Sequence, residues 1–94
     1  MKVYNMKSKK TGKAIANQFI IIDGNKIYFQ SYDTIIAVFD AFDLTLDNNA
    51  ENYSKTTSKY LAQFIYTYYV NAWYGMTLKE FLKNGVYRRA NLNA

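Results

Sequence analysis

The sequence predicts an α+β fold: an antiparallel sheet of four to five strands in the N-terminal half, with two C-terminal helices packed on one face. Up to about residue 47, short β-branched and aromatic runs alternate with turn residues, which is typical of strands. Beyond that point the apolar residues recur at helical spacing. A chain of 94 residues fits a single domain, residues 1–94, and helices layered on one sheet face can share one core with it.

The strand-like runs follow one another with short connections, which suits neighbouring antiparallel strands in a meander. Gly12 marks the first turn, and the Asp23-Gly24 pair is favoured in tight hairpins. The predicted strands are residues 3–6, 17–22, 26–30, 34–39 and 44–47.

The second strand is apolar on both of its faces. Phe19 and Ile21 share one face, and Ile20 and Ile22 share the other. We therefore expect this strand to be covered on both sides, or to be covered by a helix on one side and by a partner on the other.

The C-terminal half predicts a long helix and a short one. Ser54 and Thr56 offer N-cap oxygens for a helix over residues 55–74, which Gly75 ends. Its core-facing stripe is Leu61, Phe64, Ile65, Tyr68 and Ala72.

The short helix begins with Thr77 and Glu80, which are spaced as a capping box. Gly85 stands where a C′ glycine is expected after the last turn.

Residues 64–75 contain six aromatic rings and no charge. One helix cannot bury all of these rings against a sheet, so we expect some of them to form an exposed ridge. A loop, the N-terminal strand or a second copy of the chain would cover it if it serves packing. If it serves recognition, its rings anchor a partner, because Tyr and Trp supply contact area at low entropic cost. The ridge residues are Tyr66, Tyr69, Trp73 and Tyr74.

The net charge of +5 is unevenly distributed, with basic residues at both ends and acids in the middle. Residues 8–13, "SKKTGK", lack the first glycine and the following helix of a phosphate-binding loop, so a basic turn is predicted there. Both ends together would form a cationic patch or rim that could contact nucleic acid or an acidic protein surface. Its residues are Lys9, Lys10, Lys13, Arg88 and Arg89. Residues 60–78 hold no Lys or Arg, which disfavours base stacking on the aromatic ridge.

The chain contains neither His nor Cys, so the usual general base, the thiolate nucleophile and thiolate metal ligands are excluded. We expect no enzymatic activity, cofactor or metal. The remaining enzymatic hypothesis is a hydrolase that uses carboxylates alone, but the middle acids are predicted as solvated turn residues and lack the spacing of a calcium loop. They are Asp40, Asp43, Asp47 and Glu51.

Several segments resemble a family of small domains of unknown function, encoded mostly by phages, plasmids and other mobile elements of Gram-positive bacteria. The more specific of them are "NQFII", "FQSYD" with "TIIA", and "YSKTTSKY", and the similarity runs along nearly the whole chain. "IYTYYVNAWYGM" departs from the family in being longer and more aromatic. The resemblance implies no activity and no site residues.

What the resemblance does imply is an accessory protein that binds and inhibits or modulates a host factor. The partner would be a host protein or a protein–nucleic-acid complex, and a defence nuclease, as for anti-CRISPR proteins, is one such target. The alternatives are a small nucleic-acid-binding protein that uses the basic ends, or self-association as a homodimer. No apolar run is long enough to span a membrane, and the N-terminus has no signal-type block, so a cytoplasmic protein of the bacterial host is expected.

Overall fold

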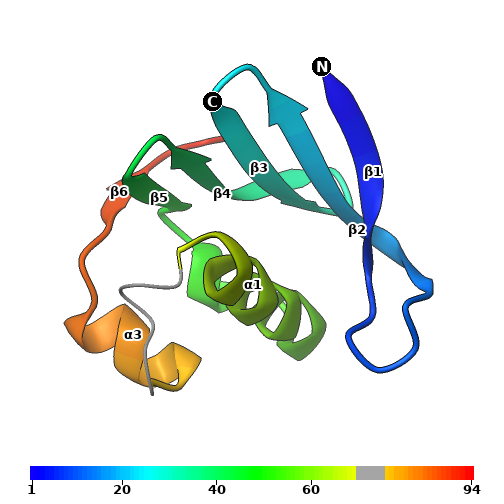
Figure 1. Cartoon of the computed structure of the whole chain (residues 1–94). Coiled ribbons are helices and arrows are strands. Elements are labelled where there is room, and N and C mark those ends of the chain that lie inside the picture. The colour runs from blue at the N-terminus through cyan, green and yellow to red at the C-terminus, as the bar shows by residue number, and fades with distance from the viewer. Residues whose placement is uncertain (70–75) are drawn as a thin grey trace.

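The computed structural model of the chain describes residues 1–69 and 76–94. Within that part, six strands form one sheet in the order β1-β2-β3-β4-β5-β6, and two α-helices lie on one side of it (Figure 1). The elements are β1 (Lys2–Lys7), β2 (Ala14–Asp23), β3 (Lys26–Ser31), β4 (Thr34–Asp40), β5 (Asp43–Asp47), the 3-10 turn η1 (Ala50–Asn52), α1 (Lys55–Tyr68), α3 (Leu78–Asn84) and β6 (Arg88–Ala90).

The α+β class and the antiparallel meander β1 to β5 are confirmed, but the prediction of four to five strands is wrong. The sixth strand, β6, follows both helices and pairs parallel with β5, with Leu46 opposite Arg89. Three residues with two arginines show no alternation that could identify a strand. Only the neighbouring edge of β5 makes this segment a strand.

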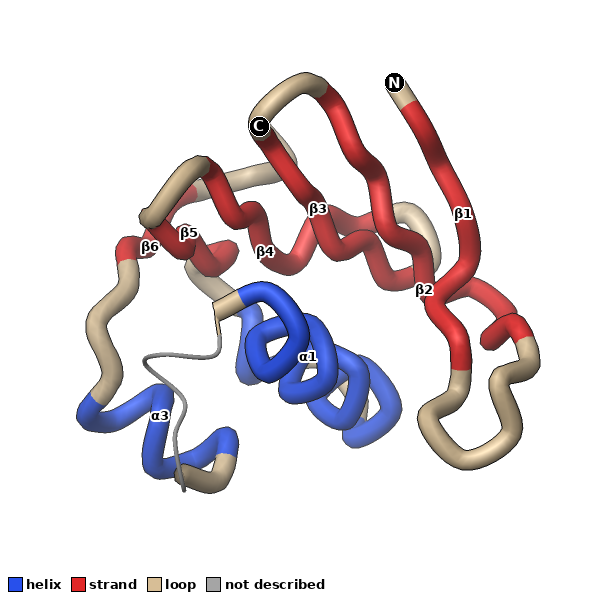
Figure 2. Tube along the Cα trace, in the orientation of Figure 1, coloured by secondary structure: helices blue, strands red, loops and turns tan. Residues whose placement is uncertain are grey.

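The core lies between the sheet and the helices, and one row of side chains across the sheet forms its floor. Ile20, Phe29, Ala37 and Leu46 are register partners on consecutive strands, and all four are buried. The α1 helix packs over β3 and β4, with the rings of Phe29 and Phe64 stacked at 5.8 Å. Figure 2 shows α1 (blue) lying under the sheet (red).

The α1 helix begins as predicted, since the Ser54 hydroxyl accepts a hydrogen bond from the Thr57 N–H. It ends earlier than the predicted residue 74: the helix stops at Tyr68, and Tyr69 has already left the helical conformation, with φ −123°. The predicted core position of Ala72 and the predicted helix end at Gly75 lie outside the described residues. None of the helices in the described part of the chain has the length and apolar content that a membrane crossing requires.

The α3 helix has the predicted capping box. Thr77 Oγ1 accepts from the Glu80 N–H at 3.2 Å, and Glu80 Oε1 accepts from the Thr77 N–H at 3.2 Å. Gly85 is not in the left-handed conformation expected of a C′ glycine, because its φ and ψ are −73° and 165°. The reason for a glycine here is steric: a Cβ would lie 2.6 Å from ring atoms of Phe81, which is buried in the core.

The C-terminal segment is held to the sheet by the buried carboxylate of Asp47, at the end of β5. It accepts hydrogen bonds from the Asn49 and Leu92 N–H groups, the Tyr53 hydroxyl and the Asn93 amide. Burial raises the pKa of the Asp47 carboxyl, but these four hydrogen bonds outweigh burial and hold the pKa below its ordinary value.

A second ionic contact fixes β6 to the turn after β5. The Arg89 guanidinium contacts both Glu51 carboxylate oxygens and donates to the Asp47 and Asn48 carbonyls. The hydrogen bonds from Arg89 lower the pKa of Glu51.

We expect the Gly85→Ala variant to be less stable, by about 1–3 kcal/mol, because the new methyl group would overlap the Phe81 ring. The backbone conformation itself suits alanine, so without this overlap the exchange would stabilise the chain. Urea unfolding measures the difference, and the neighbouring exposed Asn84→Ala variant is the control. A Gly85→Ala variant as stable as the wild type would contradict this account.

We expect the free energy of unfolding to fall as the pH drops below about 4. The pKa of Asp47 is lowered in the folded chain, so its contribution is present above the unfolded pKa and is lost as pH falls through the folded value. The free energy of unfolding of the Asp47→Asn variant should depend less steeply on pH in this window. Some pH dependence should remain, because the pKa of Glu51 is also lowered in the folded chain. The variant should also lose roughly 1–3 kcal/mol at neutral pH, because donors are left unpaired. Equal pH dependence of both proteins in urea unfolding would refute this role.

Candidate functional site

One face of the sheet is apolar and carries no helix in the described part of the chain. Both α1 and α3 lie on the opposite side (Figure 1). Register partners place Val3, Ile21, Tyr28 and Val38 in one row across β1 to β4. Val3 is 58% exposed, and the other three are half-buried. The next row adds more apolar side chains; the outer face, as we call it, is Val3, Phe19, Ile21, Tyr28, Ile35 and Val38.

This arrangement decides one of the two sides of the second strand. Ile20 points into the core under the helices, whereas Phe19 and Ile21 belong to the outer face. The side covered by helix is therefore established. The other side carries no helix in the described part of the chain, and its apolar side chains are half-buried apart from the exposed Val3.

The outer face is bordered by a row of charges. Asp23, Lys26, Asp40 and Asp43 are successive register partners, two residues along from the apolar row. Arg88 on β6 adds a second cation, and its Nη2 lies 3.8 Å from Asp43 Oδ2. This border, which we call the rim, thus carries three acids and two bases, although the whole chain has a net charge of +5.

The structure divides the predicted aromatic ridge. Tyr69 is half-buried and does not project from the helix: its ring contacts Phe39 at 5.7 Å and Phe81 at 6.2 Å, and its hydroxyl donates to the Val86 carbonyl. Tyr69 therefore bridges the sheet and α3, because α1 ends one residue earlier and the chain turns inward. Trp73 and Tyr74 lie outside the described residues.

Tyr66 is the described ridge residue that is exposed, at 51%. It stands on the side of α1 turned away from the core, and the Lys9 Nζ lies 4.4 Å from the centre of its ring. Tyr68 joins the core as predicted, against Phe64 at 5.1 Å. Burial, together with a hydrogen bond to Tyr4, raises the pKa of Tyr68 to about 12.

The predicted basic residues do not form one patch. Lys9, Lys10 and Lys13 lie in the β1–β2 loop, whereas Arg88 and Arg89 lie on β6, and β1 and β6 are opposite edges of the sheet. Arg89 is engaged with Glu51, so it is a structural residue. The two ends of the chain are separated because four strands lie between them.

The four middle acids are not gathered in a pocket. Asp47 is enclosed by its donors and Glu51 is paired with Arg89, while Asp40 and Asp43 are exposed on the rim. Among the described residues, no cluster of acids is placed to hold a metal ion. Asp47 and Glu51 instead bind the C-terminal segment, through Leu92, Asn93 and Arg89.

Sequence reasoning missed most of the outer face. It identified Phe19 and Ile21, because the second strand is visibly apolar on both sides. The same signal, apolar residues on both faces of a strand, is present at Tyr28 and Val38. The neighbours of Tyr28 are Ile27 and Phe29, and those of Val38 are Ala37 and Phe39. Strands β3 and β4 could thus have been recognised as apolar on both faces.

The chain matches a protein family in a comparison with known families. Residues 1–83 match the family described as "Family of unknown function (DUF8033)", which covers β1 to β5, α1 and most of α3. A comparison with curated proteins gave no match, and neither did a comparison with solved structures.

Proposed function

The chain belongs to DUF8033, a family of unknown function, and we propose that it is a non-enzymatic binding protein whose partner docks on the outer face. The apolar row of Val3, Ile21, Tyr28 and Val38, which no described helix covers, carries this proposal. Its central ring, Tyr28, has the residue type that most often anchors an interface.

The charges of the rim favour a protein partner over the other classes. The three carboxylates of the rim outnumber its two bases, and this excess of negative charge disfavours phosphates, so nucleic acid is a poor occupant of this surface. A second copy of the chain would bring a rim with the same excess of acid. A protein with an apolar patch and a basic border complements both parts of the surface.

We place this activity in an accessory protein of a phage or other mobile element, working in the cytoplasm of its bacterial host. There it would inhibit or modulate a host factor, with a defence nuclease as a candidate target. The resemblance of "NQFII", "TIIA" and "YSKTTSKY" to such proteins supports the setting. Charge supports the target, because a nuclease presents a basic, phosphate-binding surface that complements the acidic rim.

The decisive test starts with the tagged chain in host lysate, with and without added nuclease. The captured protein is then purified and titrated against the wild type and Tyr28→Ala. We expect capture to survive nuclease treatment and the affinity of Tyr28→Ala to fall by about 2 kcal/mol or more, because a central anchor is lost. If the partner is a nuclease, its activity should decline in proportion to the bound chain.

The matched control is Tyr32→Ala. Tyr32 is more exposed than the half-buried Tyr28, and it lies in the β3–β4 turn beside Tyr53 and Thr57, on the helix side. Urea unfolding of both variants separates lost binding from lost folding, and Asp40→Lys provides a further variant on the exposed rim. Equal losses for Tyr28→Ala and Tyr32→Ala, nuclease-sensitive capture, or a light-scattering mass of two copies held by the outer face would each overturn the proposal.

A further inference from the structure

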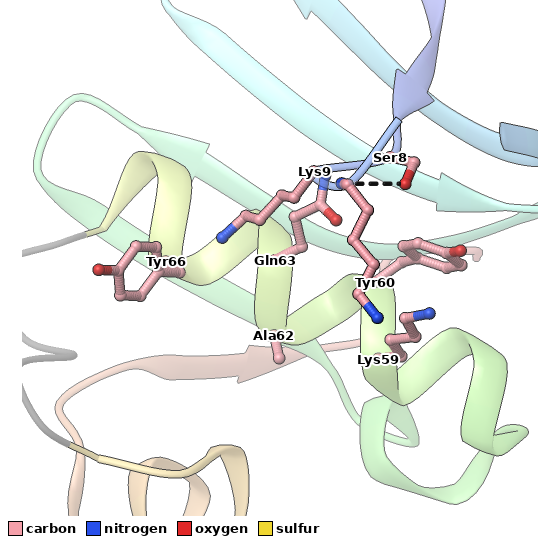
Figure 3. A pocket seen from close by; sticks show the side chains of 8 residues that line it. Ser8, Lys9, Lys59, Tyr60, Ala62, Gln63 and Tyr66 are labelled. Atoms are coloured by element: carbon pink, nitrogen blue, oxygen red, sulfur yellow. Dashed lines mark hydrogen bonds between the residues drawn. The ribbon is translucent and has the colours of Figure 1, made fainter. Parts of the chain in front are cut away.

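A second surface of opposite character lies on the helix side of the molecule, between the β1–β2 loop and α1. There the chain forms a cleft of about 330 Å³. Figure 3 shows that Lys9 reaches from the loop toward Tyr66, while Lys59 and Tyr60 lie nearer the N-terminal end of α1. Its volume is at the lower end of the range for ligand sites.

The loop that forms one wall is held in place by its own hydrogen bonds. The Ser8 N–H donates to the Lys13 carbonyl at 2.9 Å, and the Gly12 N–H donates to the Ser8 carbonyl at 2.8 Å. Gly12 has φ +71°, a left-handed conformation that glycine adopts without strain. Gln63 on α1 donates to the Lys7 carbonyl at 2.9 Å, which ties the loop to the helix. The two walls of the cleft are therefore joined.

The cleft combines cations with aromatic rings. Lys9, Lys10 and Lys59 line it, and no carboxylate is among its lining residues. Two ammonium groups already lie over rings, Lys9 over Tyr66 at 4.4 Å and Lys59 over Tyr60 at 5.4 Å. Tyr66 is half exposed, whereas Tyr60 packs partly against the core. A ligand that carries an anionic group next to a flat aromatic ring could pair with the ammonium groups and stack on a tyrosine ring.

We propose that this cleft binds single-stranded nucleic acid. The three ammonium groups contact phosphates of the strand, Lys9 moving off the Tyr66 ring to do so, and an unpaired base takes its place on that ring, as in other single-strand binders. A duplex presents phosphates but keeps its bases paired, so it cannot use the ring. The main objection from sequence, that residues 60–78 hold no cation, is answered by the β1–β2 loop, which brings Lys9 and Lys10 from another part of the chain.

This site is independent of the proposed function, because the outer face lies on the opposite side of the sheet. A free nucleotide shares the same chemistry of phosphate next to base, so it forms a separate arm of the test.

Fluorescence anisotropy with a labelled single strand of about 16 nucleotides tests the site. Three phosphate contacts predict a slope of about −2 for log affinity against log salt, or about a 20-fold loss between 50 and 200 mM. Lys9→Ala/Lys10→Ala should reduce the slope to about −0.7. Tyr66→Ala should weaken binding at least about 5-fold, whereas Tyr66→Phe keeps the ring and should bind within about 2-fold of the wild type.

Lys79→Ala/Lys83→Ala is the matched control, since it removes the same charge from exposed positions outside the cleft and outside the rim. It should retain the wild-type salt slope. The same sequence as a duplex, and the mononucleotide, should each bind more weakly than the single strand. The proposal is overturned if the control lowers the slope as far as the loop variant does, or if Tyr66→Ala binds like the wild type. Duplex, mononucleotide or anionic vesicles binding as well as the single strand would also overturn it.

Discussion

The packing of α1 against β3 and β4, centred on the rings of Phe29 and Phe64, is the contact on which the rest of the structure depends. This packing covers the buried row from Ile20 to Leu46. In the described part of the chain, α1 and α3 together form the helical layer on that side of the sheet. Because the helix has one buried stripe, its opposite side is left free to face the β1–β2 loop. The same contact thereby forms one wall of the cleft and leaves the outer face without a described helix.

The two surfaces separate the charges of the chain in space. Asp23, Asp40 and Asp43 lie at the turns that border the outer face, while lysines from the first loop meet α1 on the other side of the sheet. A chain with a net charge of +5 can therefore present an apolar face with an acidic rim and a cationic cleft at once. The protein partner and the single-stranded nucleic acid that we propose would therefore bind at different places.

Much of the fold was readable because its signals are local. The Ser54 cap, the Thr77–Glu80 capping box and the Asp23-Gly24 hairpin each depend on neighbours within a few residues, and each occurs as predicted. One local prediction failed, the left-handed conformation of Gly85; the other failures concern distant parts of the chain. Tyr69 looked exposed on a helical wheel, but the helix ends before it and its ring fits between Phe39 and Phe81.

By itself, the sequence determined the fold class, the antiparallel meander and the absence of His and Cys chemistry, because periodicity, caps and composition do not depend on distant contacts. Only the tertiary structure decided that Arg88–Ala90 is a strand, that Arg89 pairs with Glu51, and that the Lys9 ammonium lies over the Tyr66 ring. These outcomes join residues tens of positions apart. Chain order does not encode such pairings until the sheet and α1 have brought their partners together.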